Sequence, residues 1–178
     1  MCEPVHEVVR EVVMHRRSVR SFEPKPIEDG VLAEILEAGH QAPSAANRQP
    51  WQFVVVRDVQ RRRELAEACS SQSWLAEAGA MIVGLGFPSA SERWYRVDVA
   101  IAMENMILAA TSFNLGTCWI GAFDEVAVKR VIGAPDDTRV VAITPVGVPR
   151  GDWPSQRPRK PFGQVFNAES FGRPLQLG

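Results

Sequence analysis

The sequence predicts a layered domain of α-helices and β-strands, with a sheet that is covered by helices on at least one face. Two observations lead to this prediction. Apolar runs typical of strands alternate along the chain with segments whose apolar residues recur at helical spacing. In addition, 178 residues with 46% apolar content are enough for one hydrophobic core and short for two. We therefore expect one domain over residues 1–178.

The first half of the chain is predicted to hold three helices and two strands. Valines at helical spacing between Val5 and Val13 indicate an amphipathic helix that ends near HRRSVRSF. A second helix is indicated after Asp29, where acidic residues in the first turn complement the helix dipole. WQFVVV is typical of a strand, DVQRRRELAEAC of a helix that begins at an aspartate, and AMIVGLG of a second strand.

The second half is predicted to begin with one long helix, from Arg93 to Phe113, that is apolar around most of its circumference. Such a helix is typical of a core or an interface. TCWIGAF is expected to be a third strand, followed by a short helix between a cap at Asp124 and a stop at Gly133. RVVAITPVGV is expected to be the fourth strand. After Pro149 the chain is too rich in Pro, Gly and Arg to form a core of its own, so it lies on another surface or is disordered.

The charge balance argues against two classes of partner. The formal net charge is -1, so no overall field would attract nucleic acid or an anionic membrane. The long apolar helix contains Asp98, Glu104 and Asn105, which a membrane-spanning helix would rarely tolerate. We expect no nucleic-acid partner and no membrane insertion.

Cysteine and histidine usage indicates a reduced, metal-free protein. The three cysteines, Cys2, Cys69 and Cys118, are widely spaced and form no CxxC pair. The histidines share no metal-ligand spacing, and the N-terminus has no apolar signal-peptide core. We expect free thiols, no metal site and a cytoplasmic location.

Two basic clusters are candidate anion sites. RRSVR, from Arg16 to Arg20, places three guanidiniums and a hydroxyl within five residues, a combination that suits a phosphate. RPRK, from Arg157 to Lys160, is a second cluster near the C-terminus. For both clusters the alternative is a solvated basic turn.

Two loops are candidate contacts for a polar, planar ligand. APSAANRQPW offers Ser44, Asn47 and Gln49 beside small residues that would let a backbone come close. The alternative is a helix-stop loop in which the two amides cap backbone groups. WIGAF places Gly121 and Ala122 between a strand and a helix start, where free N–H groups point outward, although a simple tight turn is the alternative.

Taken together and in this order, five segments resemble the nitroreductase family of FMN-dependent oxidoreductases. They are RRSVRSF, APSAANRQPWQFVVV, DVAIAMENMILAATSFNLGTCWIGAF, VGVP and RPRKPF. The resemblance implies an α+β, nitroreductase-like fold, with a central mixed β-sheet flanked by helices. It also implies that residues 148–178 form an extended C-terminal arm that wraps the partner subunit of a homodimer.

The resemblance further implies one noncovalent FMN at each subunit interface and NAD(P)H as a transient reductant. The ribityl phosphate and one flavin edge would be held by Arg16, Arg17, Ser18, Arg20, Arg157 and Arg159. Pro43, Ser44 and Asn47 would come from the other subunit.

Three further positions follow from the same resemblance. Gln72 is similar to the family's amide side chain near the flavin, and Gly121 and Ala122 match the place where a backbone N–H meets flavin N5. Trp94 and Tyr95 either form a substrate lid or pack at the start of the long helix.

The activity implied is hydride transfer from NAD(P)H through flavin N5 to an electron-poor small molecule, such as a nitroaromatic or a quinone, in ping-pong fashion. No catalytic side chain is needed, and Arg20 would stabilise the reduced flavin. The alternatives are a flavin-binding or sensing protein with little turnover, and dehalogenating or flavin-destroying chemistry on the same fold.

Overall fold

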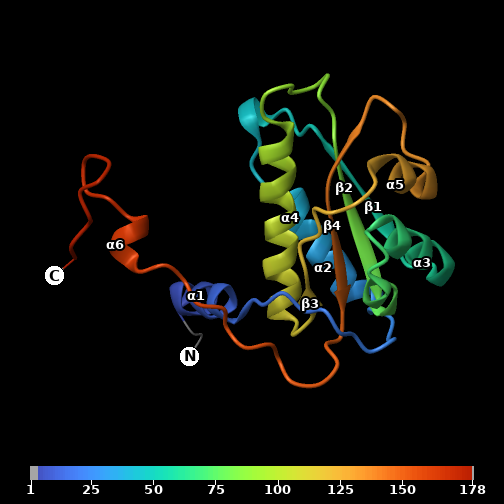
Figure 1. Ribbon diagram of the computed structural model, residues 1–178, viewed down its shortest axis with the longest axis horizontal. Coiled ribbons are helices and arrows are strands. Elements are labelled where there is room, and N and C mark those ends of the chain that lie inside the picture. Colours follow the sequence, from blue (N-terminus) through green and yellow to red (C-terminus); the bar gives the residue numbers. More distant parts are fainter. Residues whose placement is uncertain (1–3, 178) are drawn as a thin grey trace.

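Four strands form the central sheet of this computed structural model, which describes residues 4–177. The strands are β1 (Trp51–Val56), β2 (Ala80–Gly86), β3 (Gly116–Thr117) and β4 (Arg139–Gly147), and they lie in the order β1-β2-β4-β3 (Figure 1). β2 and β4 are the inner strands, and every residue of β2 is buried. This burial on both faces explains why AMIVGLG is apolar throughout.

Helices connect and cover these strands, close to the predicted positions. They are α1 (Val5–His15), α2 (Asp29–His40), α3 (Val59–Ala68), α4 (Tyr95–Ser112), α5 (Glu125–Ile132) and α6 (Phe162–Val165), with 3-10 turns η1 (Ala45–Asn47) and η2 (Ser73–Glu77). The predicted caps are also present. Asp58 accepts the N–H of Arg61 at 2.8 Å, Asp124 accepts the N–H groups of Val126 and Ala127, and Gly133 ends α5 with φ +68°.

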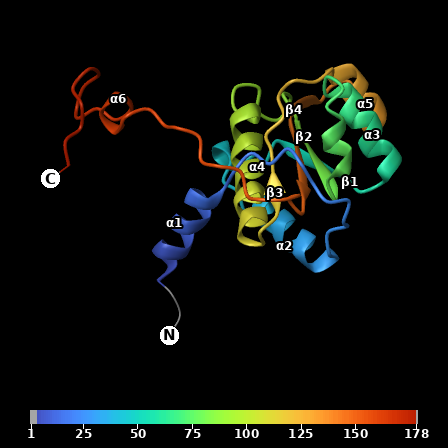
Figure 2. The same cartoon turned by 60° about the horizontal axis from the view of Figure 1, so that its bottom comes forward.

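The sheet separates two parts of the core. Met81, Val83 and Leu85 of β2 face the side that α3 and α5 cover. Ala80 and Ile82 face the other side, with residues of α2 and α4; Figure 2 shows these two helices. This alternation along β2 follows from the two-residue period of a strand.

The prediction of a mixed sheet was wrong for the four strands. All pairs between the four strands are antiparallel, and the parallel pairing in the described residues is the isolated bridge between Ser18 and Thr117. An α+β fold with helices on both faces of the sheet is confirmed.

The predicted third strand, residues 117–123, was too long. Only Gly116 and Thr117 form β3, and Ile120 makes a single bridge to Ile143 of β4. The Thr117 carbonyl accepts the N–H of Val19 instead, so this edge of the sheet is shared with the segment after α1. The chain then leaves the sheet at the exposed Gly121 and Ala122.

The long helix α4 buries one side and leaves apolar residues on another. Val99, Met103 and Met106 are buried in the core, whereas Val97 and Ile101 are exposed. α1 has no buried residue, and exposed apolar side chains recur along the C-terminal arm, at Phe162, Val165, Phe166, Phe171 and Leu177. Figures 1 and 2 show the arm reaching away from the sheet and its helices.

Two cysteines are buried free thiols, as expected. Burial raises the pKa of the Cys69 thiol to about 11 and also raises the pKa of Cys118, so both are protonated at neutral pH. Cys2 lies outside the described residues. Within residues 4–177, no group of His, Cys, Asp and Glu side chains is arranged to hold a metal ion. No helix in the same range combines the length and apolarity that crossing a bilayer requires.

Candidate cofactor site

A small cavity lies where the chain leaving α1 meets the C-terminal arm. Its volume is about 250 Å³. The residues that line it are Arg16, Arg17, Ser18, Arg20, Pro154, Ser155, Gln156, Arg157 and Arg159. The structure therefore brings together the two basic clusters, which lie well over one hundred residues apart in the sequence.

The first wall of the cavity is held by the edge of the sheet. Val19 is 2% exposed, and its N–H donates to Thr117 at 2.8 Å beside the Ser18–Thr117 bridge. Because Val19 points into the core, its neighbours Ser18 and Arg20 face the opposite way, toward the cavity. A buried valine between two polar residues thus sets the direction of both.

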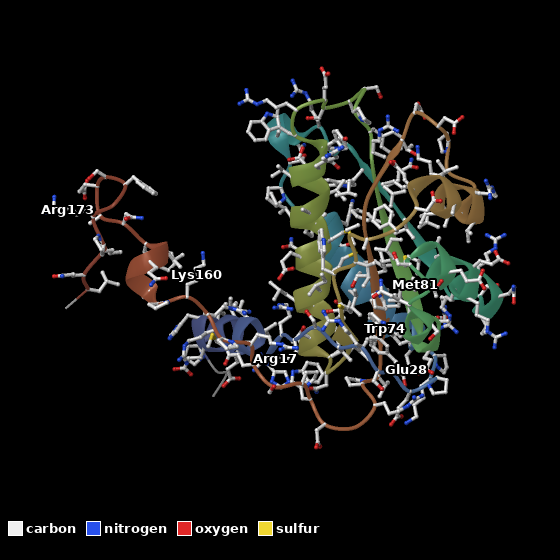
Figure 3. The ribbon with its side chains drawn as sticks, in the orientation of Figure 1. Arg17, Glu28, Trp74, Met81, Lys160 and Arg173 are labelled. Atoms are coloured by element: carbon white, nitrogen blue, oxygen red, sulfur yellow. The ribbon has the colours of Figure 1, made fainter. Side chains whose placement is uncertain are left out.

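The second wall is the C-terminal arm, which two side chains hold in place. The Trp153 ring stacks on His15 with centroids 4.6 Å apart, and its Nε1–H donates to the His15 carbonyl at 2.8 Å. Arg17, which is labelled in Figure 3, donates through Nε to the Pro154 carbonyl at 3.1 Å. Residues 155–162 are exposed, so these contacts position the arm just before it lines the cavity.

We expect Trp153→Phe to weaken anion binding at this cavity modestly. Phenylalanine keeps a ring to stack on His15 but loses the N–H that His15 accepts. One such hydrogen bond contributes about 0.5 to 1.5 kcal/mol, or roughly 2- to 12-fold in a dissociation constant. Titration with FMN measures the change, and Trp94→Phe is the control because Trp94 is an exposed tryptophan away from the cavity. Equal FMN affinities in the unmodified protein, Trp153→Phe and Trp94→Phe would contradict the role of Trp153.

The charges around the cavity are largely uncompensated. Five guanidiniums line it, and the ion pair recorded for them is a long one, 3.9 Å from Arg16 Nε to Glu104 Oε1. Burial raises the pKa of the Glu104 carboxyl, an effect that Arg16 opposes. A phosphate dianion bears several acceptor oxygens and fits the Ser18 hydroxyl and the guanidinium donors that remain, since Arg17 Nε and Nη1 already donate to backbone carbonyls. The residues present therefore suit the phosphate of FMN.

The cavity is not the largest hollow on the molecule. A groove of about 710 Å³ between α3 and α5 has Arg61, Glu64, Glu67, Asp124 and Arg130 in its lining, and a hollow of about 730 Å³ beside α3 has Arg62, Arg63, Glu67 and Glu77. Because acids stand beside the bases in both, neither offers a concentrated positive charge for an anion. We therefore place the candidate site at the smaller cavity.

Pro43, Ser44 and Asn47 lie away from this cavity, in the loop around η1. The loop adjoins the N-terminal end of α4, whereas α1 and the start of the arm lie near its C-terminal end (Figure 1). The cavity residue Arg16 contacts Glu104, six residues or about 9 Å along α4 from Asp98, which contacts the loop. None of Pro43, Ser44 and Asn47 lines the cavity of its own chain.

The amides of this loop bind each other and the loop's own backbone. Gln49 Nε2 donates to Asn47 Oδ1 at 3.2 Å, and Ser44 Oγ accepts the Gln49 N–H at 2.9 Å. This arrangement agrees with the alternative of a self-capped loop for Asn47 and Gln49. The Ser44 hydroxyl hydrogen remains a donor.

The other predicted residues lie outside the cavity as well. Gln72 is half-buried and donates to the Cys69 carbonyl at the end of α3. Gly121 and Ala122 are exposed just before α5, beside the Trp119 ring. Tyr95 is buried against Gly86, which supports packing at the start of α4, whereas Trp94 is exposed.

Sequence reasoning missed several residues of the site. Pro154, Ser155 and Gln156 line the cavity, and Trp153 holds them there. A tryptophan in an arm with few apolar residues was the available signal, because a large aromatic residue in such a segment commonly marks its contact with the protein body.

The chain is thus an α+β protein with a basic cavity of about 250 Å³ at one edge of its sheet. Residues 13–85 and 70–148 match the nitroreductase family. The chain is 32% identical to a putative NADH dehydrogenase/NAD(P)H nitroreductase of Archaeoglobus fulgidus, over 79% of this chain and 85% of that one. The protein belongs to the nitroreductase family, a family of NAD(P)H- and flavin-dependent oxidoreductases.

Solved structures agree with this assignment. A nitroreductase family protein from Clostridium novyi NT is 31% identical with a TM-score of 0.76, covering 93% of this chain and 96% of that one. The NADPH:FMN oxidoreductase from Vibrio harveyi, solved in complex with NAD+, is 26% identical with a TM-score of 0.85, covering 96% and 80%.

Proposed function

We propose that this protein is an FMN-dependent oxidoreductase that transfers a hydride from NAD(P)H to an electron-poor acceptor, such as a nitroaromatic or a quinone. The observation that carries the proposal is the cavity where five arginines and Ser18 meet, in a chain of the nitroreductase family. Bound FMN would supply the redox chemistry at N5, with NAD(P)H and the acceptor using the same face in turn.

The roles of the cavity residues follow from their donors. Arg16, Arg17, Ser18, Arg157 and Arg159 would hold the phosphate and one flavin edge, which they can do because they line a single cavity. Arg20 would stabilise the negative charge that gathers on reduction. No protein nucleophile takes part in this proposal.

The remaining predicted residues belong to the same proposal. Exposed backbone at Gly121 and Ala122 would approach the flavin near N5, and Gln72 would offer its amide oxygen. Gln72 already donates through Nε2 to the Cys69 carbonyl, which leaves that oxygen free to accept.

A homodimer is part of the proposal. Exposed apolar residues on α1, on α4 and on the arm would be covered by a second subunit. The second subunit would also bring Pro43, Ser44 and Asn47 to the cofactor, because these residues do not line the cavity of their own chain. Sedimentation of the FMN-loaded protein at micromolar concentration should show a dimer, and a folded, FMN-loaded monomer would overturn this part.

Purification and turnover test the function. The protein should be yellow, with one noncovalent FMN per chain, and should oxidise NADH or NADPH faster when a nitroaromatic or a quinone is present. A colourless protein that takes up no added FMN would exclude the proposal. FMN binding without acceptor-dependent turnover would favour a flavin-binding or sensing protein. Loss of the flavin or release of halide from a halogenated substrate would favour the other chemistries.

Arg20→Met should make bound FMN harder to reduce. A full charge at about 4 Å is worth about 4 kcal/mol at an effective dielectric constant of 20, and solvent at the exposed Arg20 reduces this. If on the order of 1 to 2 kcal/mol remains, the two-electron midpoint falls by roughly 20 to 45 mV.

Spectroelectrochemical titration of the FMN-saturated variant measures that shift. Arg63→Met on α3 is a control that removes the same charge from an exposed position outside the cavity. A midpoint equal to that of the unmodified protein would refute the role of Arg20. Weaker FMN binding at an unchanged midpoint would identify Arg20 as a phosphate ligand only.

A further inference from the structure

The loop from Ser44 to Gln49 has an unusual backbone. Ala46, Asn47 and Gln49 have φ values of +52°, +55° and +48°, in the left-handed region that favours glycine. Alanine and glutamine in this region carry a conformational penalty, so the loop keeps this shape only where surrounding contacts hold it. Residues 46–49 are exposed and bind one another through Gln49 Nε2 and Asn47 Oδ1, so we look for the contacts that join the loop to the rest of the protein at its ends.

Two side chains bind the ends of this loop. Ser44 Oγ accepts the N–H of Gln49 at 2.9 Å, which closes the loop on itself. The Ala45 N–H donates to Asp98 Oδ1 at 3.2 Å, which joins the loop to the first turn of α4. The Asp98 bond is the contact that fixes the loop relative to the long helix.

Burial of the Asp98 side chain at this position is unfavourable for folding. It is 3% exposed, and its second oxygen, Oδ2, is buried without a hydrogen-bond partner among the described residues. No ion pair is recorded for it within residues 4–177. A half-satisfied buried carboxylate destabilises a fold, whereas an apolar residue of the same size would not.

An acid near the N-terminus of α4 also complements the helix dipole, which is the ordinary reason for an aspartate there. The dipole does not require this acid to be buried, and an exposed position on the same turn would serve it equally. The hydrogen bond to Ala45 does require burial, because that N–H lies between the loop and the helix. A charged acceptor also makes a stronger bond than a neutral one.

We propose that Asp98 is a positioning residue for the cofactor site: it holds the Ser44–Gln49 loop in the strained shape in which that loop meets the flavin. The inference rests on the proposed function, in which Ser44 and Asn47 contact FMN from the second subunit. The Asp98 carboxylate acts through the Ala45 N–H and touches neither FMN nor substrate.

The test compares two substitutions with a matched control. Asp98→Leu removes the acceptor and keeps the size, whereas Asp98→Asn removes the charge but keeps Oδ1. Asn105→Leu is the control, because Asn105 lies on the same helix and donates to the Ala38 carbonyl at the same 3.2 Å, away from the loop. Three quantities are measured for each protein: amide exchange of residues 45–49 without FMN, the FMN dissociation constant, and the melting temperature.

The expected result is specific to the loop. Asp98→Leu should speed exchange of the Ala45 amide and raise the FMN dissociation constant, each by at least about tenfold, the loss expected for one hydrogen bond to a charged acceptor. Asp98→Asn should fall between the unmodified protein and Asp98→Leu in both quantities, because its neutral Oδ1 still accepts the Ala45 N–H but makes a weaker bond than a carboxylate. Asn105→Leu should lower the melting temperature without speeding exchange at Ala45.

Three outcomes would overturn the inference. One is the finding that Asp98→Leu leaves both the exchange of the Ala45 amide and the FMN affinity unchanged. A second is an Asp98→Asn protein whose exchange at Ala45 and FMN affinity are changed as much as in Asp98→Leu. That result would mean that the charge of Asp98 acts on the helix dipole rather than through the bond to Ala45. The third needs no variant: Ala45 exchanging in the unmodified protein as fast as in an unstructured chain of the same sequence. If the unmodified protein binds no FMN at all, the proposed function fails. If the unmodified protein and Asp98→Leu bind FMN equally well, only the inference about Asp98 fails.

Discussion

Arg17→Met is expected to weaken FMN binding by about 10- to 150-fold, since a hydrogen bond to a charged group contributes about 1.5 to 3 kcal/mol. Arg17 lines the cavity and also joins its two walls. Its Nε donates to the Pro154 carbonyl at 3.1 Å, and its Nη1 donates to the Met14 and Arg16 carbonyls at 2.6 and 2.9 Å. Methionine keeps most of the aliphatic length and loses every donor.

Fluorescence titration with FMN measures this loss, and limited proteolysis measures whether the arm loosens. Cleavage of the variant should increase after Trp153, because the contact of Arg17 with Pro154 is gone. Arg63→Met is again the matched control for charge and should leave both readings unchanged. If Arg17→Met bound FMN as tightly as the unmodified protein, neither role of Arg17 would stand.

Gly116→Ala is expected to destabilise the fold and the cavity together. A Cβ on Gly116 would lie 2.7 Å from Cβ and Cγ2 of Val19 and 2.8 Å from its Cγ1. Val19 cannot move aside, because it is buried against Phe22 and its N–H is bound to Thr117. Overpacking of this kind costs about 1 to 3 kcal/mol, or roughly 2 to 12 °C in melting temperature for a chain of this length.

The same substitution should weaken FMN binding, because Ser18 and Arg20 flank Val19. Gly30→Ala is the control: a Cβ there meets nothing within 4 Å, and alanine suits the helix better than glycine. Val19→Ala should partly rescue Gly116→Ala, so a double-mutant cycle should show favourable coupling between the two substitutions. Additive losses would show that the clash with Val19 is not the cause.

Local chemistry made several elements predictable. Asp58 and Asp124 cap their helices through hydrogen bonds to N–H groups two or three residues away, so the evidence lies within one turn of chain. The strand at Ala80–Gly86 was recognisable because burial on both faces selects an unbroken apolar run. The long helix was recognised from its length and from apolar residues all around it.

The length of β3 was not predictable in the same way. Residues 117–123 have a strand-like composition, but the number that pair depends on what lies beside them. The N–H of Val19 donates to the carbonyl of Thr117, and within residues 118–123 only Ile120 pairs with β4. Which neighbour fills the open edge of a sheet is a long-range property, and residues 117–123 do not contain it.

The candidate site likewise has features that the local sequence determines and features that depend on long-range packing. The sequence alone determined that Arg16–Arg20 and Arg157–Lys160 are basic clusters suited to an anion, because that property belongs to the side chains themselves. Only the tertiary structure decided that the two clusters share one cavity, that Trp153 and Arg17 hold the arm against α1, and that Asp98 binds the Ser44–Gln49 loop. These contacts join residues 53 to 138 positions apart, and pairings over such distances are selected by the packing of the whole chain rather than by local sequence.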